Sequence, residues 1–164
     1  NDPESPTTGS AARVPDHVPL ASGRPCLLVP HDVGPARFGS NILIAWNGSR
    51  EAARATADAM PLLRAAQQVT VVQIQGAVGD PFASNLDLLA FCAHLARHEI
   101  AIETRIEATD GRSVAQALLS LGTEIGADLL VMGAYGHTRL RELVLGGVTR
   151  EILVGMTMPV LMSH

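Results

Sequence analysis

The segment Asp128-Leu129-Leu130-Val131-Met132-Gly133-Ala134-Tyr135-Gly136 decides the fold, because an apolar run ends abruptly in two closely spaced glycines. The run predicts a buried strand over residues 128–132. Gly133 and Gly136 then predict a loop, since glycine adopts backbone angles closed to other residues and lets a ligand approach the chain. After nine further residues, Gly146 and Gly147 precede a helical stretch at 148–153.

A strand, a glycine loop and a helix N-terminus in this order make a candidate anion site. The first N–H groups of a helix have no partner within the helix, and the helix dipole adds partial positive charge at the same end. The glycines also fit a simpler interpretation, in which they form only a tight strand-to-helix turn and a helix C-cap. Their spacing, considered below, favours the anion site.

Outward from this segment, short apolar runs alternate with helical patterns. Ser49 is a predicted N-cap, and Ser113 begins a predicted capping box. Pro61 allows a kink or a division into two helices. The alternation predicts an α/β domain with a doubly wound, five-stranded parallel sheet and helices on both faces. We expect strands at 41–46, 69–74, 100–106, 128–132 and within 158–164, and helices at 49–66, 84–98, 113–125 and 148–153.

Two loops are the natural ligand-binding positions in such a sheet, because ligands bind beyond the carboxyl ends of the strands where the winding direction reverses. One loop is 46–48 and the other is 133–136. The dinucleotide fingerprint would place three glycines after the first strand, where this chain has Asn47-Gly48-Ser49. This position argues against an NAD site.

The N-terminal region differs in composition from the rest of the chain. Residues 1–23 are rich in Pro, Ser, Thr, Asp and Gly, which predicts a loop or linker. The run 24–31 resembles 158–164, since each has a proline before a short apolar run and a histidine close behind. Chance explains so short a match; alternatively, the N-terminal run is the end of a preceding repeat.

Composition excludes several classes of function. The chain has 164 residues, 47% of them hydrophobic, and a net charge of −4, which suits one folded domain and argues against nucleic-acid binding. All 12 basic residues are arginine, so a Walker A loop and a Schiff-base lysine are excluded. Cys26 and Cys92 have no metal-ligand spacing and predict buried thiols in a reducing compartment, the cytoplasm. No run predicts a membrane span or signal peptide.

The glycine spacing resembles a known ATP-site pattern. Gly133-x2-Gly136-x9-Gly146 is similar to the G-2x-G-9x-G-(S/T) motif of universal stress proteins, and residues 44–49 and 127–133 support the resemblance. It covers 41–164. It implies an adenine nucleotide alpha hydrolase-like sheet with strand order 3-2-1-4-5. It also implies that 39–164 form one domain, and that 1–38 are a linker plus the last strand of a preceding, truncated repeat.

The resemblance further implies a set of ligand and partner contacts. The last strand would lie at a homodimer or repeat interface, so residues 26–29 are expected to pair with 160–162. ATP, with Mg²⁺, would be the ligand. Glycines would hold the triphosphate, Val148 and Thr149 would approach the phosphates, Tyr135 would lie beside the sugar, and the other residues would surround the base and ribose. The implied contacts are Ala45, Trp46, Asn47, Ile74, Met132, Gly133, Tyr135, Gly136, Gly146, Gly147, Val148 and Thr149.

Three residues depart from the family pattern. Gly147 stands where Ser or Thr is usual, which removes one hydroxyl donor but keeps the N–H group. Asn47 stands where Asp is usual, so an acceptor becomes a mixed donor and acceptor. Trp46 is bulkier than the usual residue and either fills the base site or stacks on the base.

Other polar residues have simpler interpretations. His137 is a candidate phosphate contact or a solvated loop residue, and Arg139 and Arg141 are favoured as a solvated helix face. Asp128 is predicted to accept hydrogen bonds from nearby N–H groups. His94 and His98 have a spacing that is compatible with metal binding, but no third ligand accompanies them. Ser49 lacks the neighbouring base that a nucleophile would need.

These observations predict a nucleotide-binding regulatory module of the stress response. Two alternatives remain. One is an enzyme that hydrolyses ATP slowly at the same site, although no lysine, positioned base or carboxylate pair favours it. The other is a degenerate, nucleotide-free module that acts through dimerisation or protein contacts.

Overall fold

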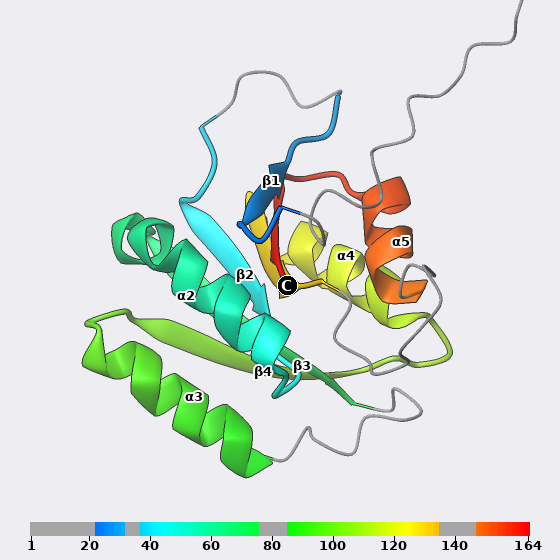
Figure 1. The fold of residues 1–164 in the computed structure, drawn as a ribbon. Coiled ribbons are helices and arrows are strands. Elements are labelled where there is room, and N and C mark those ends of the chain that lie inside the picture. The colour runs from blue at the N-terminus through cyan, green and yellow to red at the C-terminus, as the bar shows by residue number, and fades with distance from the viewer. Residues whose placement is uncertain (1–21, 32–36, 76–84, 135–146) are drawn as a thin grey trace, which may run out of the picture.

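The computed structural model describes residues 22–31, 37–75, 85–134 and 147–164, which form one six-stranded sheet with two helices on each face (Figure 1). The predicted α/β class is confirmed. The strands are β1 (Cys26–Leu28), β2 (Asn41–Ala45), β3 (Gln68–Gln75), β4 (Ile102–Ala108), β5 (Leu129–Gly133) and β6 (Val160–Ser163), and the helices are α2 (Arg50–Ala65), α3 (Asn85–Arg97), α4 (Val114–Glu124) and α5 (Gly147–Gly155).

The sheet has the order β1-β6-β5-β2-β3-β4. Strands β2 to β6 are all parallel, and their arrangement is the predicted 3-2-1-4-5 order. The predicted number of five strands is corrected to six, because β1 pairs antiparallel with β6. Cys26 lies opposite Met162 and Leu28 opposite Val160, which confirms the predicted pairing with 160–162 for residues 26–28; Val29 lies beyond β1. The backbone groups on the outer side of β6 favour this addition, since an unpaired sheet edge readily accepts another strand.

Two hydrophobic cores lie on opposite faces of the sheet. Ile42 and Ile44 of β2 face one core, where α2 and α3 pack, and Leu43 faces the other, where α4 and α5 pack. All three side chains are at most 1% exposed. This division follows from the alternation of side chains along a strand, so a strand covered on both faces is apolar throughout.

The predicted helix signals are confirmed wherever the structure describes them. The hydroxyl of Ser49 accepts a hydrogen bond from the Ala52 N–H, and Ser113 makes the full capping box with Gln116. Ser84, where the helix expected at 84–98 would begin, lies outside the described residues. Helix α2 is continuous through Pro61, which excludes the division into two helices, one of the two possibilities that Pro61 left open. The carbonyl that Pro61 leaves unbonded belongs to exposed Ala57, where water can hydrate it.

Asp128 connects the start of β5 to the segment before β2, as its predicted role of N–H acceptor requires. Its Oδ1 accepts hydrogen bonds from the N–H groups of Gly39 and Asn41, each at 2.9 Å, and its Oδ2 accepts one from Ser40 at 3.0 Å. The Asp128 N–H donates in return to the Asn41 carbonyl. This side chain therefore sets where β2 enters the sheet beside β5.

Candidate functional site

The two predicted ligand loops leave the sheet side by side. Ala45, the last residue of β2, is paired with Met132 of β5, so the chain leaves both strands at the same edge (Figure 1). The loop at 46–48 therefore begins beside the loop that starts at Gly133. The switch point that the strand order predicts is present at this place.

Four of the predicted contact residues share one face of the sheet. Met132 is buried in the core beneath α4 and α5, and Ala45, Ile74 and Val148 pack against that core while remaining partly exposed. Thr149 of α5 is 3% exposed. A partly exposed apolar patch at the carboxyl edge of the sheet can receive the flat face of a base.

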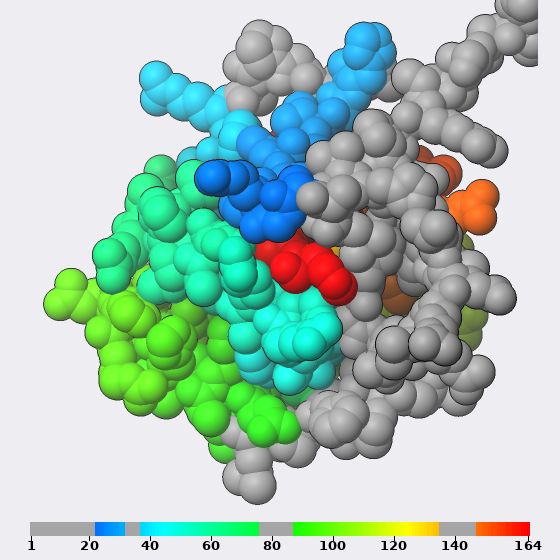
Figure 2. Space-filling view, in the orientation of Figure 1, coloured from blue at the N-terminus to red at the C-terminus, as the bar shows by residue number. Residues whose placement is uncertain are grey.

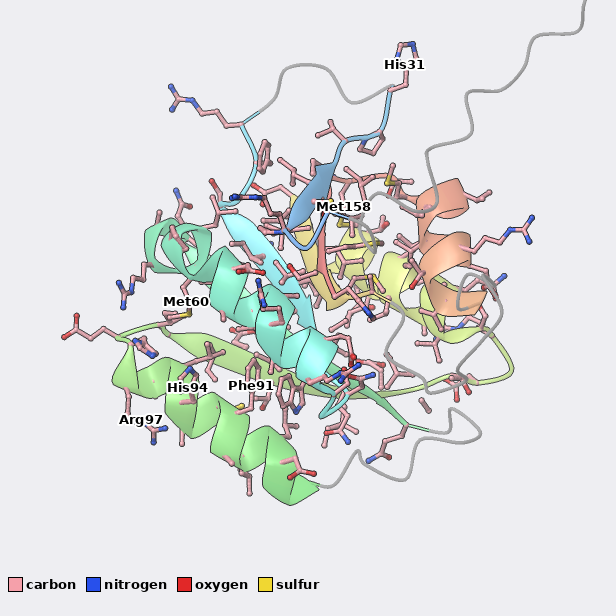
Figure 3. All side chains as sticks on the ribbon, viewed as in Figure 1. His31, Met60, Phe91, His94, Arg97 and Met158 are labelled. Atoms are coloured by element: carbon pink, nitrogen blue, oxygen red, sulfur yellow. The ribbon has the colours of Figure 1, made fainter. Side chains whose placement is uncertain are left out.

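Trp46 lies on the opposite face of the sheet from Ala45. Its indole ring stacks on Phe91 of α3, with ring centroids 3.8 Å apart and an interplanar angle of 6°. Figure 3 shows Phe91 between α3 and the sheet. The Trp46 Nε1–H is buried and has no hydrogen-bond partner among the residues that the structure describes. One face of the Trp46 ring is therefore covered by Phe91, and the ring packs between the sheet and α3.

Asn47 and Gly48 form the turn that starts α2. The Asn47 Oδ1 accepts a hydrogen bond from the Ser49 N–H at 3.1 Å, and Gly48 has a φ of 75°. A left-handed residue of this kind favours glycine. Because the bond uses the side-chain oxygen, which Asp also has, Asn47 preserves the acceptor and adds an amide N–H₂ group.

Gly133 ends β5 in direct contact with the first turn of α2. A Cβ atom at this position would lie 2.6 Å from the Ala52 backbone nitrogen and 2.6 Å from the Glu51 carbonyl carbon. Glycine is therefore required here by packing between a strand and a helix, whatever the loop binds. By contrast, a Cβ atom on Gly147, at the exposed start of α5, would meet no atom of the described residues within 4 Å.

The remaining candidates fall outside the described residues. These are Tyr135, Gly136, His137, Arg139, Arg141 and Gly146. The structure thus describes nine of the twelve implied ligand contacts, and it brings the starts of the two loops together.

Three charged or titratable side chains that the sequence did not indicate lie near the start of the glycine loop: Arg50, Glu51 and His164. Glu51 is 5% exposed, and its Oε1 accepts a hydrogen bond from the Arg50 Nε at 2.6 Å. His164 Nδ1 lies 3.1 Å from the Ala134 carbonyl oxygen. Figure 2 shows the C-terminal end of the chain (red) at the surface beside the start of α2 (cyan). An acidic residue in a first helical turn normally indicates only a favourable dipole contact, so the sequence carries no further signal.

The pKa of Glu51 reflects competition between burial and its partners. Burial alone raises the pKa of this carboxyl. The hydrogen bond from Arg50, a backbone hydrogen bond and the charges of Arg50 and His164 outweigh burial, so the pKa lies below its usual value. Glu51 is therefore ionised at neutral pH and holds Arg50 beside the loop.

The histidine and cysteine candidates show other contacts. His94 and His98 meet edge to face with centroids 4.8 Å apart, and His98 Nδ1 lies 3.2 Å from an Arg64 nitrogen. The described residues contain no group of three or more potential metal ligands and no helix long and apolar enough to cross a membrane.

Cys26 and Cys92 are free thiols, and burial raises the pKa of Cys92, which lowers its reactivity.

Comparison with known proteins identifies the family. The model of the universal stress protein family matches residues 40–164. The chain belongs to the universal stress protein family. A segment of 46 residues, 28% of the chain, is 41% identical to the universal stress protein Slr1230 of Synechocystis, and the match spans 16% of that protein's length.

Solved universal stress proteins have the same fold. One from Archaeoglobus fulgidus DSM 4304 has a TM-score of 0.70 and 21% identity over 90% of this chain, which spans 52% of the length of that chain. A universal stress protein in complex with cAMP has a TM-score of 0.58 and 19% identity, over 76% of this chain and 97% of that one. The chain therefore spans about half the length of the Archaeoglobus fulgidus protein.

Proposed function

We propose that this domain is a regulatory module of the stress response that binds ATP or a related adenine nucleotide, with Mg²⁺, and hydrolyses it slowly or not at all. The observation that carries the proposal is the pairing of Ala45 with Met132, which starts both predicted ligand loops at one edge of the sheet. Family membership supports it, as does the similar fold of a universal stress protein solved with cAMP. The two free cysteines suit a reducing compartment, and we place the protein in the cytoplasm.

In the proposed complex, the ligand lies across the carboxyl edge of the sheet. The base and ribose contact the patch of Ala45, Ile74, Met132 and Val148, with Asn47 and Tyr135 beside them. The triphosphate lies against the backbone of Gly133, Gly136, Gly146 and Gly147, near Thr149. The exposed N-terminus of α5 favours this direction, because the first N–H groups of a helix have no partner within the helix and the helix dipole attracts an anion. Trp46, held by its stack on Phe91, forms a rigid wall behind the loop.

Millimolar ATP–Mg²⁺ is expected to raise the melting temperature of the purified chain. Ligand at about one hundred times its dissociation constant stabilises the folded state by about 2.7 kcal/mol, which corresponds to about 5–10 °C for a domain of this size. Gly136→Val, which adds bulk to the proposed phosphate loop, should abolish the shift. The variant is first melted without ligand to establish that it folds. Equal shifts in the two proteins would contradict the glycine loop as the site, and no shift in either would favour a nucleotide-free interaction module.

A second proposal concerns assembly and rests on β1. We propose that residues 1–38 comprise a linker and the last strand of a preceding repeat, so that β1 takes the place of a partner's strand beside β6. The antiparallel register supports this, as does the similarity of 24–31 to 158–164. Leu27 and Val29 are 43% and 51% exposed, as expected of a strand whose second face packs on another domain.

Removal of β1 from the sheet is expected to produce a homodimer. In an antiparallel pair, only every second residue points its N–H group at the neighbouring strand. Proline has no N–H group, so the double variant Leu27→Pro with Leu28→Pro removes a donor to β6 whichever of the two residues provides it. The freed β6 edge can then pair with the β6 of a second copy, and light scattering should give twice the mass of the wild type. Leu27→Val with Leu28→Val keeps the strand and serves as the control. An unchanged mass in the proline variant would show that the β6 edge does not mediate association.

A further inference from the structure

Arg50 and Glu51 form an ion pair whose two side chains differ sharply in exposure. The Arg50 side chain is 86% exposed, whereas that of Glu51 is 6% exposed. Ion pairs between two exposed residues contribute little, but a buried carboxylate without a partner is costly. The pair is therefore anchored on the Glu51 side, and the guanidinium is held at a defined place on the surface.

That place is the start of the glycine loop. The Cβ of Glu51 lies 2.8 Å from where a Cβ of Gly133 would stand, so the first turn of α2 and the end of β5 are in contact. Arg50 is the first residue of α2 and follows the loop at 46–48 and the N-cap Ser49. Its guanidinium is thus tied to the first turn of α2, which contacts Gly133 at the end of β5.

The hydrogen bonding of Arg50 leaves its binding edge available. Only Nε bonds to Glu51, and within the described part of the chain the two terminal nitrogens make no hydrogen bond or ion pair. A guanidinium has a planar fork of donors, and its terminal edge fits two oxygens of a phosphate. A simpler explanation is that Arg50 only neutralises the charge of Glu51. The bond from Nε is enough for that role, which leaves the two terminal nitrogens of Arg50 without a function.

We propose that Arg50 binds a phosphate group of the ligand and that Glu51 is the positioning residue that holds its guanidinium at the glycine loop. This inference rests on the proposed nucleotide site and adds a specificity: phosphorylated nucleotides are preferred over the nucleoside. The chain contains no lysine, so where a phosphate is bound by a side chain of the kind that lysine or arginine provides, that side chain must be an arginine. His164, whose Nδ1 lies 3.1 Å from the Ala134 carbonyl oxygen, is a further basic side chain in the same region.

The test compares ATP–Mg²⁺ with adenosine by isothermal titration calorimetry. Arg50→Gln should weaken ATP binding by about tenfold or more and leave adenosine binding unchanged, because a hydrogen bond to a charged group is lost only with the phosphorylated ligand. Glu51→Gln should weaken ATP binding by a smaller factor, since Arg50 is present but no longer held. The matched control is Arg54→Gln, which lies one turn further along α2 and also bonds a carboxylate, that of Asp58 at 3.1 Å. It should change neither affinity.

The outcomes separate this inference from the proposed function. A wild-type protein that binds neither ligand would overturn both. Wild-type binding of ATP with an unchanged affinity in Arg50→Gln would overturn the role of Arg50 alone. Equal losses in Arg50→Gln and Arg54→Gln would mean that general surface charge, not a positioned guanidinium, attracts the ligand. Parallel losses of ATP and adenosine binding would mean that the substitution disturbs the fold of the loop.

Discussion

Gly133→Ala is expected to lower the free energy of unfolding by about 3 kcal/mol, near the upper end of the cost of overpacking a tightly packed site. The added methyl group would lie 2.6 Å from two backbone atoms of α2, closer than van der Waals contact allows. Backbone atoms of a helix cannot move aside by a change of rotamer. Either α2 shifts as a whole or β5 withdraws, and both movements open the core between them.

Gly147→Ala is the matched control, because it adds the same methyl group to another glycine of the same proposed loop. Among the residues that the structure describes, this methyl group meets no atom within 4 Å, so the stability of the variant should differ from that of the wild type by less than about 1 kcal/mol. Urea unfolding of both variants measures the difference. Equal stability of the two would show that the contact between Gly133 and α2 is not close in solution. A practical consequence is that substitution of Gly133 tests packing, whereas Gly136 is the position to change when nucleotide binding is tested.

Asp128→Ala is expected to destabilise the fold by about 3 kcal/mol, because three backbone N–H groups lose a charged acceptor at once. The donors belong to Gly39, Ser40 and Asn41, which lead directly into β2. Hydrogen exchange at these amides should speed up in the variant more than exchange at Ile44, in the middle of the strand.

Asp128→Asn is the informative comparison for this cluster. Its single oxygen can still accept the two bonds that share Oδ1, but its amide group would face the Ser40 N–H with another donor. We expect a loss of stability of about half that of the alanine variant, measured by urea unfolding. If Asp128→Ala loses no more stability than Asp128→Asn, the three hydrogen bonds do not hold the segment that enters β2, and the structural role given to Asp128 is wrong.

Short-range patterns in the sequence predicted much of the fold. The serine caps of α2 and α4 depend on neighbouring residues, so Ser49 and Ser113 could be read directly. Helix α2, however, continues through Pro61 because the carbonyl that loses its bond lies on the exposed side. Whether a proline interrupts a helix depends on what surrounds that carbonyl, and a sequence pattern does not contain this information.

The candidate site divides in the same way. The glycine spacing predicted which loop to consider, and the parallel pairing of β2 with β5 brings that loop beside Asn47. The side chain of Trp46 could not be placed from the sequence, because its stacking partner Phe91 comes from a helix 45 positions later (91 − 46). Arg50 and Glu51 were missed for a related reason: a carboxylate in a first helical turn is usually exposed.

The sequence by itself determined the α/β class, the Ser49 and Ser113 caps and the place of the glycine loop, because periodicity, capping and motif spacing are local properties of the chain. Only the tertiary structure decided that Gly133 must be glycine to admit α2, that Glu51 is buried and that Trp46 faces α3. Each of these depends on the distance between elements that are remote in sequence. Packing sets such distances, and with them which charges and rings surround the proposed ligand.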